Sequence, residues 1–292
     1  MSSEIFKEIV GAVPADFASP EADFQTVRNT MAPFHGHPTG ADLAIDFVEY
    51  GGVRCAWHSL PRQSRTGMVA LHFHGGAFVS CGLDAYHFYG EIICRQLNLP
   101  VLLPDYSLAP ENPYPAAHMD CLNAYRGLLE SGVQPEKIVV LGESCGGALG
   151  LQTLIAARRE GLPMPACFVS VTGWFDLNVM EYPAGRDPFL TPEWVRNRAR
   201  DYTQGKIELD DADLSPSNAD LSGMPPLYLQ IGEYDTMAPG ALEVVRRATM
   251  SGVSVTMESW PGMVHGWHGL IGSGVPEAEK AWARVKAFVS CL

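Results

Sequence analysis

The feature that most constrains this chain is an apolar run that ends at a glycine-flanked serine and continues into a helical stretch. Val139–Leu141 has the pattern of a buried strand, and Gly142-Glu143-Ser144-Cys145-Gly146 follows it directly. A helical pattern over 146–160 comes next. The two glycines leave room for a sharp turn in which Ser144 takes a strained conformation and exposes its hydroxyl. This unit indicates an α/β sheet and marks Ser144 as a candidate nucleophile.

Strand-like and helical stretches alternate along much of the remaining chain. Short apolar runs rich in β-branched residues predict strands over Ile45–Tyr50, Val53–Leu60, Met68–Phe73, Val101–Pro104, Lys137–Leu141, Cys167–Thr172, Leu227–Ile231 and Val255–Ser259. Helical periodicity predicts helices over Tyr86–Leu97, Ala117–Ser131, Gly146–Glu160, Ala238–Ser251 and Glu277–Cys291. Gly51-Gly52 predicts a hairpin between the first two strands. The alternation predicts a mostly parallel sheet with helices on both faces.

Two segments fit this alternation poorly. Residues 1–40 show no strand pattern, and residues 177–222 contain one helical stretch near Trp194–Tyr202. Each is either a cap folded over one end of the sheet or a surface arm or insertion. We therefore expect a catalytic core made of residues 41–176 and 223–292, with 1–40 and 177–222 as the cap region.

Composition excludes several other classes of protein. The chain has 292 residues, of which 47% are hydrophobic and 18% charged, so it can bury the core of one large α/β domain. Its net charge of −13 opposes binding to nucleic acid or to anionic membrane surfaces. The seven cysteines are odd in number and scattered, which indicates neither a disulfide framework nor a zinc cluster. The patch Asp210–Asp213 is typical of a solvated face rather than a metal site.

Targeting signals are not visible in the sequence. The start Met1-Ser2-Ser3-Glu4 leads into an amphipathic stretch, without the basic region and apolar core of a signal peptide. Apolar runs stay well below the roughly 18 residues that a membrane span needs. We expect a reduced, soluble, cytoplasmic protein with no metal and no cofactor.

A glycine-rich turn after the strand Met68–Phe73 is a candidate oxyanion hole. Gly75 and Gly76 allow backbone amides to face a ligand without an obstructing Cβ, and the Cys145 amide beside the serine adds another donor. His72 and His74 lie on one strand face, but a third metal ligand is missing nearby. We expect His74 to support the turn by hydrogen bonding.

The general base is expected to be a histidine whose pKa lies near neutrality. His265 follows the last predicted strand in a loop marked by Pro261, Gly262 and Gly266, at the same edge of the sheet as Ser144. His268 is the competitor. Gly266 favours His265, because it lets the loop bend tightly around that residue.

The third member of a triad is an acid that orients the imidazole. Asp235 ends the strand-like run 227–231 and its following turn, and it obeys the order serine, acid, histidine. Asp176 obeys the same order after the preceding strand, and Glu233 is a third option. We favour Asp235.

Four segments together resemble the hormone-sensitive-lipase-like esterases, also called bacterial family IV, of the α/β-hydrolase fold. They are His74-Gly75-Gly76-Ala77-Phe78, Asp105-Tyr106-Ser107-Leu108-Ala109-Pro110-Glu111, Gly142-Glu143-Ser144-Cys145-Gly146-Gly147 and Pro261-Gly262-Met263-Val264-His265-Gly266. The resemblance implies an eight-stranded sheet with a small helical cap, and hydrolysis of short- to medium-chain esters without metal or cofactor. It also implies oxyanion donors at the amides of Gly75, Gly76, Ala77 and Cys145, and it allows a homodimer.

Three residues depart from the family pattern. Ala77 stands where a third glycine is usual. Glu143 replaces the usual aspartate and is expected to alter the pH dependence. Cys145 replaces the usual alanine, which predicts sensitivity to thiol reagents. Among the other family residues, we expect Asp105, Glu111 and Asp120 to be buried scaffold carboxylates that accept backbone hydrogen bonds.

The sequence therefore predicts a carboxylic ester hydrolase that uses Ser144, His265 and Asp235 through an acyl-enzyme. A lactone hydrolase or an acetyl-hydrolase of a decorated small molecule would share the whole catalytic set. Side chains of the cap would choose the substrate, with Phe34, Trp174, Phe175, Phe189 and Trp194 as candidates. A non-catalytic small-molecule receptor on the same fold would have lost the serine or the histidine, and both are present.

Overall fold

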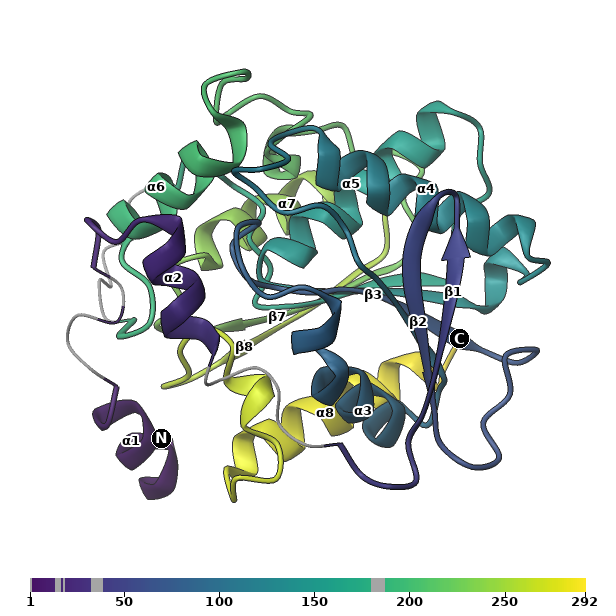
Figure 1. Ribbon diagram of the computed structural model, residues 1–292, viewed down its shortest axis with the longest axis horizontal. Coiled ribbons are helices and arrows are strands. Elements are labelled where there is room, and N and C mark those ends of the chain that lie inside the picture. Colours follow the sequence, from purple (N-terminus) through teal and green to yellow (C-terminus); the bar gives the residue numbers. More distant parts are fainter. Residues whose placement is uncertain (1, 14–16, 18, 33–38, 180–186) are drawn as a thin grey trace.

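The computed structural model describes residues 2–13, 17, 19–32, 39–179 and 187–292, and Figure 1 shows their arrangement. Eight strands form one sheet in the order β1-β2-β4-β3-β5-β6-β7-β8. Their bounds are β1 (Ala44–Tyr50), β2 (Val53–Ser59), β3 (Val69–Phe73), β4 (Val101–Pro104), β5 (Ile138–Glu143), β6 (Cys167–Val171), β7 (Leu227–Gly232) and β8 (Val255–Trp260). Strand β2 runs antiparallel to β1 and β4, and all other pairs are parallel. The predicted α/β-hydrolase sheet is confirmed.

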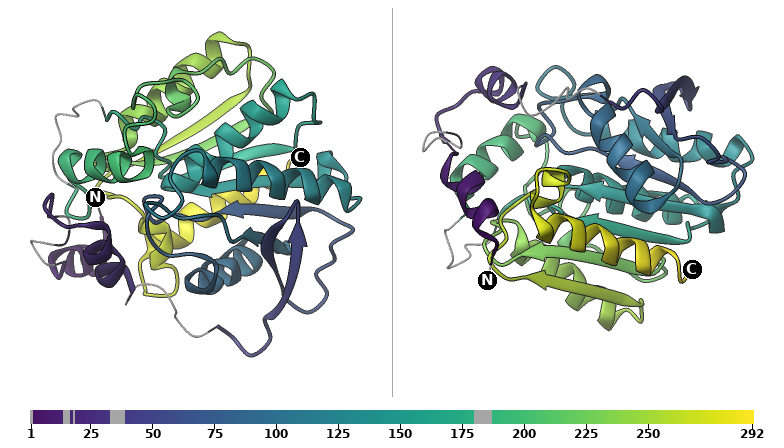
Figure 2. Two further views of the ribbon diagram at one scale, coloured as in Figure 1. Left: turned by 45° about the horizontal axis from the view of Figure 1, so that its top comes forward. Right: turned by 90° about the horizontal axis from the view of Figure 1, so that it is seen from below.

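Helices cover both faces of this sheet. One face carries α3 (His87–Leu97) and α8 (Pro276–Val289), and the other carries α4 (Ala116–Glu130), α5 (Cys145–Arg159) and α7 (Ala238–Met250) (Figures 1 and 2). Each face has its own buried apolar cluster. The central strands β3, β5, β6 and β7 are buried along their whole length, as parallel strands covered twice must be.

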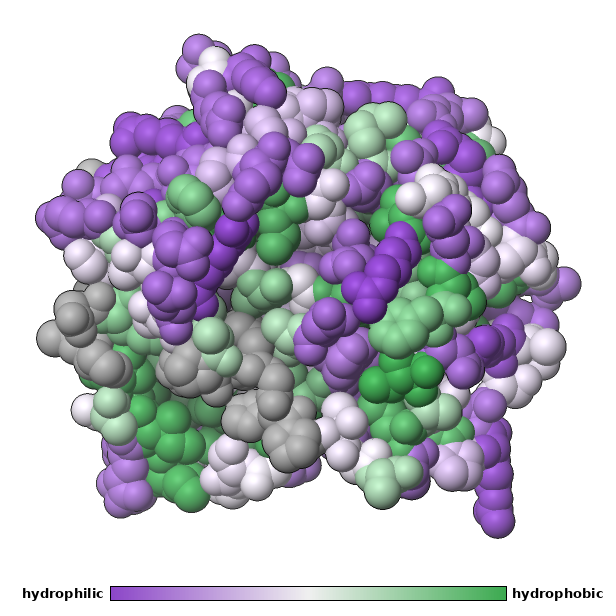
Figure 3. Space-filling view, viewed as in Figure 1, coloured by the Kyte–Doolittle hydropathy of each residue, from purple (hydrophilic) through white to green (hydrophobic). Residues whose placement is uncertain are grey.

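Three further helices lie beside the carboxyl edge of the sheet. They are α1 (Glu4–Gly11), α2 (Phe24–Met31) and α6 (Pro192–Thr203). The stretch expected near Trp194–Tyr202 lies in α6, whereas the sequence predicted no helix for α1 or α2. Short 3₁₀ turns occur at η2 (Leu83–Ala85), η3 (Pro135–Lys137), η4 (Pro216–Asn218) and η5 (Trp267–Leu270). On the face that Figure 3 shows, apolar surface gathers beside α1.

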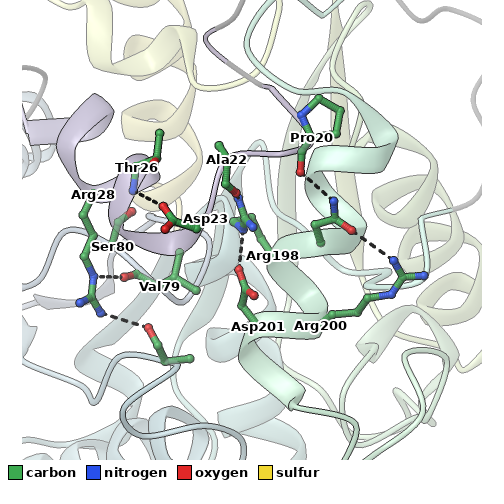
Figure 4. A network of polar contacts seen from close by, with 12 residues as sticks. Pro20, Ala22, Asp23, Thr26, Arg28, Val79, Ser80, Arg198, Arg200 and Asp201 are labelled. Carbon is green, nitrogen blue, oxygen red and sulfur yellow. Dashed lines mark hydrogen bonds and ion pairs between the residues drawn. The ribbon is translucent and has the colours of Figure 1, made fainter.

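The segment around α2 is attached on both of its sides (Figure 4). On one side, Arg198 in α6 donates to the backbone oxygen of Ala22 at 2.7 Å. On the other side, Arg28 Nε donates to the backbone oxygen of Val79 at 2.7 Å. The Arg28 guanidinium also pairs with both carboxylate oxygens of Glu111, each at 2.7 Å. Helix α2 therefore connects α6 to the loop that follows β3.

Within the described ranges, no helix combines the length and the apolar character needed to cross a membrane. Two carboxylates of the acidic patch Asp210–Asp213 contact other groups of the protein. Asp213 forms an ion pair with Arg159, and the Asp211 carboxylate accepts a hydrogen bond from the Asp213 backbone at 2.8 Å.

Candidate active site

Ser144 lies in a sharp turn between β5 and α5. Its φ of 54° and ψ of −125° place it in a region that non-glycine residues rarely adopt, at a cost of about 1–3 kcal/mol. Gly142 and Gly146 must be glycines because a Cβ at either position would clash with backbone atoms. A Cβ on Gly146 would lie 1.9 Å from the backbone oxygen of Phe73, and one on Gly142 would lie 2.3 Å from the oxygen of Gly146. The strained turn is thus held by the close packing of the start of α5 against β3 and β5.

Two loops from neighbouring strands bring an acid and a histidine to Ser144. His265, after β8, has its Nε2 2.9 Å from Ser144 Oγ. Its Nδ1 lies 2.9 Å from Asp235 Oδ1 in the loop after β7. The same Asp235 oxygen accepts a hydrogen bond from the backbone N–H of Met237, also at 2.9 Å. Parallel order places the carboxyl ends of β5, β7 and β8 at one edge, which explains how residues far apart in sequence meet.

The electrostatics of this group favour a charged histidine. Burial opposes an imidazolium at His265, but the charge of Asp235 and its hydrogen bond outweigh burial and raise the pKa of His265. Asp187 and Glu143 add to this effect. In the neutral form, Nδ1–H donates to Asp235 and Nε2 is left to accept from the Ser144 hydroxyl. When His265 is neutral, the arrangement therefore suits proton transfer from Ser144, and the raised pKa stabilises the imidazolium that forms.

The competing acids are engaged elsewhere. Asp176 Oδ1 accepts a hydrogen bond from the backbone N–H of Asn178 at 3.1 Å. Glu233 Oε2 accepts one from the backbone N–H of Gly262 at 2.8 Å, in the loop that precedes His265. Asp235 is therefore the acid that hydrogen-bonds to the His265 ring.

The competing histidine is a core residue. His268 is fully buried, and its Nε2 lies 2.8 Å from Gln230 Oε1. Its ring packs against Trp267 at 3.9 Å between centroids. Burial lowers the pKa of His268 well below its usual range, so it stays neutral.

The loop after β3 faces Ser144 through Gly76 and Ala77. Both residues line the cavity that contains Ser144. Gly76, Ala77 and Phe78 have φ values of 114°, 54° and 65°, and this left-handed run turns the loop sharply. The Gly76 oxygen accepts hydrogen bonds from the backbone N–H of Ser80 at 2.9 Å and from its hydroxyl at 2.8 Å. The loop shape is therefore fixed before a substrate binds.

Gly75 packs against Glu143, whereas Gly76 and Ala77 line the cavity. A Cβ there would lie 2.2 Å from Glu143 Oε2, so the loop packs directly on that carboxyl. Glu143 Oε2 also accepts a hydrogen bond from the Tyr86 hydroxyl at 2.9 Å. Burial raises the pKa of Glu143, against the opposing effects of His265, Tyr86 and the hydrogen bond with the Gly75 backbone. The Gly75 amide is therefore directed to Glu143, so this geometry does not support Gly75 as one of the predicted oxyanion donors.

The Cys145 side chain points away from the reaction centre. Its Sγ is buried and accepts a hydrogen bond from the backbone N–H of Phe78 at 3.3 Å. Burial raises the pKa of the thiol to about 12. Thiol reagents need an accessible thiolate, so the burial of Cys145 argues against the expected sensitivity. The sulfur instead supports the strained loop at Phe78.

His74 lies beneath the same loop. Its Nδ1 is 2.6 Å from the Gly75 oxygen and 3.0 Å from the Tyr106 hydroxyl. The Tyr106 ring stacks on the His74 ring at 4.0 Å. His72 is fully buried and stacks on Tyr89. In the part of the chain that the structure describes, no group of three or more potential metal ligands occurs.

The scaffold carboxylates hold neighbouring loops. Asp105 accepts from the backbone N–H of Leu83 at 3.1 Å, and Asp120 accepts from that of Ser107 at 2.8 Å. Asp105 and Asp120 are only partly buried, and the prediction of burial is wrong for Glu111, whose side chain is 53% exposed. Glu111 pairs with Arg28, a cation that sequence reasoning did not consider.

A cavity of about 420 Å³ opens above Ser144. Its walls are mostly apolar, with Ile9, Ala12 and Val13 contributed by α1 and its C-terminal end. Phe189 and Trp194 line it as expected. Trp174 and Phe175 are instead buried in the core, so their expected role in substrate choice is wrong. Phe34 lies outside the described residues.

Sequence reasoning missed Tyr86 and Asp187. Tyr86 holds Glu143, and Asp187 contacts the His265 backbone. Neither belongs to a spacing pattern that indicates its role, because each contact joins segments far apart in the chain.

Known proteins share this architecture. A family described as alpha/beta hydrolase fold matches residues 70–269. An acetyl-hydrolase of Streptomyces hygroscopicus is 32% identical over 76% of this chain and 75% of its own length. Esterase LipI of Mycobacterium tuberculosis is 32% identical over 96% of this chain and 92% of its own length. A crystal structure of an esterase from the bacterial hormone-sensitive lipase family superimposes with a TM-score of 0.90 and 31% identity, covering 99% of this chain and 98% of that one.

Proposed function

Because this chain belongs to the alpha/beta hydrolase fold family and is a serine ester hydrolase of the hormone-sensitive-lipase type, we propose that it cleaves carboxylic esters through an acyl-enzyme on Ser144. His265 is the base and Asp235 its acid partner. The observation that carries this proposal is the continuous pair of 2.9 Å contacts from Asp235 through His265 to Ser144. Both contacts lie within the range that nucleophile activation requires.

The reaction begins when His265 Nε2 takes the proton of Ser144 Oγ as that oxygen attacks the ester carbonyl. Asp235 stabilises the imidazolium. The developing oxyanion is held by the amides of Gly76, Ala77 and Cys145, each contributing about 3 kcal/mol in the transition state. The imidazolium then protonates the leaving alcohol, which departs. Water, deprotonated by His265, attacks the acyl carbonyl and regenerates Ser144.

We also propose that residues 1–40 and 177–222 form a cap over the core of 41–176 and 223–292. Residues from α1 and α6 line the cavity above Ser144, which supports this division. Arg28 joins the N-terminal segment to the loop after β3, next to the proposed oxyanion donors. The cap would therefore shape the pocket and steady that loop.

Short- to medium-chain acyl groups fit the apolar walls and limited volume of the cavity. Each buried methylene adds about 0.8 kcal/mol of binding until the chain meets a wall. We expect kcat/KM to rise from p-nitrophenyl acetate to p-nitrophenyl butyrate and to fall for p-nitrophenyl palmitate. Phe189→Ala removes part of the wall and is expected to move the optimum toward longer chains.

Initial-rate measurements across the ester series check this expectation. Phe47→Ala is a matched control, since Phe47 is 54% exposed and lies on the edge strand β1. It is expected to keep the wild-type profile. A profile that continues to rise through palmitate, or one that Phe189→Ala leaves unchanged, would contradict the proposed acyl pocket.

An acetyl-hydrolase of a decorated small molecule is a second candidate. It is favoured by the acetyl-hydrolase relative at 32% identity. A strong preference for acetyl over butyryl esters would select it. Ester and lactone hydrolysis use the same proposed residues, so lactones belong in the same substrate series.

A further inference from the structure

A buried carboxyl group outside the proposed triad connects two loops, the one that carries Asp235 and the one that carries His265. Asp187 belongs to the insertion between β6 and α6 and is 7% exposed. Its Oδ2 accepts a hydrogen bond from the backbone N–H of His265 at 3.1 Å. The same oxygen accepts one from the backbone N–H of Thr236 at 3.4 Å. One oxygen atom therefore bridges the loop after β7 and the loop after β8.

The rest of this segment fixes the carboxyl in place. Asp187 Oδ1 accepts a hydrogen bond from the backbone N–H of Phe189 at 2.9 Å, which closes a local turn. The Thr236 hydroxyl donates to the backbone oxygen of Leu190 at 2.7 Å. Residues 187–190 are thus joined to the loop of the acid at two points and to the loop of the base at one.

The chemistry of the group explains why its contacts are needed. A buried carboxyl is costly unless its oxygens accept hydrogen bonds. Burial and the charge of Asp235 raise the pKa of Asp187, while His265 and the backbone of Phe189 act in the opposite direction. Protonated or not, the side chain keeps an oxygen that can accept from two backbone amides. The bridge therefore does not depend on a charge.

We propose that Asp187 is a positioning residue that holds His265 at hydrogen-bonding distance from Ser144 by fastening its backbone to the loop of Asp235. The inference rests on the proposed function. A displacement of about 1 Å at a catalytic group can lower a rate about 100-fold. Phe189 and Leu190 also line the substrate cavity, so this bridge ties the pocket wall to the base.

Two substitutions separate the bridge from the local turn. Asp187→Ser keeps a short acceptor for the Phe189 amide but cannot reach His265 and Thr236. Asp187→Asn keeps a carbonyl oxygen of the original reach. With p-nitrophenyl butyrate, Asp187→Ser is expected to lower kcat about 100-fold with KM little changed. Asp187→Asn is expected to lose less than about tenfold, because the shared acceptor remains.

The measurement uses the full chain, with kcat expressed per active site titrated by phenylmethylsulfonyl fluoride, so an unfolded fraction does not count. Asp220→Ala is the matched control. Asp220 lies in the same proposed cap segment, 177–222, and accepts a backbone hydrogen bond from Ser222, but it is exposed. Its kcat and KM are expected to equal those of the wild type.

The inference is overturned if Asp187→Ser keeps the wild-type kcat, if only KM changes, or if Asp187→Asn loses as much as Asp187→Ser. If Asp187→Ser does not fold, Thr236→Val is tested in its place. That substitution removes the hydrogen bond from the Thr236 hydroxyl to the backbone oxygen of Leu190. A loss confined to kcat is then expected, and an unchanged kcat overturns the inference. A wild-type chain without ester hydrolysis would instead overturn the proposed function itself.

Discussion

Replacing Asp235 with Asn will lower kcat about 10⁴-fold. Asp235 Oδ1 accepts from the Nδ1–H of His265 and from the backbone N–H of Met237. An asparagine carries no charge to stabilise the imidazolium, and the orientation that turns its NH₂ toward His265 presents a donor to Nδ1. In that case His265 takes the other tautomer, with the proton on Nε2, where it cannot accept from Ser144. The fold will persist, since the substitution conserves shape.

Asp176→Asn is the matched comparison for this result. Asp176 follows β6 as Asp235 follows β7, but its carboxylate contacts the backbone of Asn178. Its kcat is expected to stay near the wild-type value. Steady-state kinetics on one ester decide the matter. If Asp176→Asn lost its activity while Asp235→Asn remained active, Asp176 rather than Asp235 would be the acid of the triad.

His265→Ala and Ser144→Ala will each lower kcat by roughly six orders of magnitude, and the double variant will lose no more than either single one. The reason is that Ser144 attacks only when His265 takes its proton, so the two residues act as a unit. Residual hydrolysis will come from the oxyanion amides and from binding.

Kinetics of the three variants against one ester measure this non-additivity. His87→Ala serves as a control, because His87 is partly exposed and hydrogen-bonds to His58, away from the cavity. It is expected to remain active. Losses that multiply in the double variant would mean that Ser144 and His265 act independently.

The sheet was predictable because its signals are local. Strands such as Leu227–Gly232 are short, apolar and rich in β-branched or aromatic residues, and their helices carry a clear helical period. The turn at Ser144 was predictable because the glycine-flanked serine between a strand and a helix is a local pattern, and Gly142 lies directly against Gly146 within it. Helices α1 and α2 were not, since each has only eight residues and depends on packing rather than on its own propensity.

The site was only partly predictable for a related reason. Asp176 and Asp235 both follow strands that end at the same edge, so order along the chain cannot choose between them. The choice depends on how each loop bends. Burial was misjudged for Glu111 because its partner, Arg28, lies far away in sequence. The direction of the Cys145 side chain depends on the loop at Phe78, which also belongs to another segment. The role of Asp187 could not be predicted for the same reason, since its partners are backbone amides of distant loops.

Covalent labelling is the sharpest test of whether Ser144 is the nucleophile that carries the acyl group. The protein is incubated with phenylmethylsulfonyl fluoride, and its intact mass and peptides are measured by mass spectrometry. We expect one sulfonyl group per chain, located on Ser144, with ester hydrolysis lost in proportion. The adduct will be absent from Ser144→Ala and will form far more slowly in His265→Ala. An adduct on another residue, or hydrolysis that persists in fully labelled protein, would contradict the proposed role of Ser144.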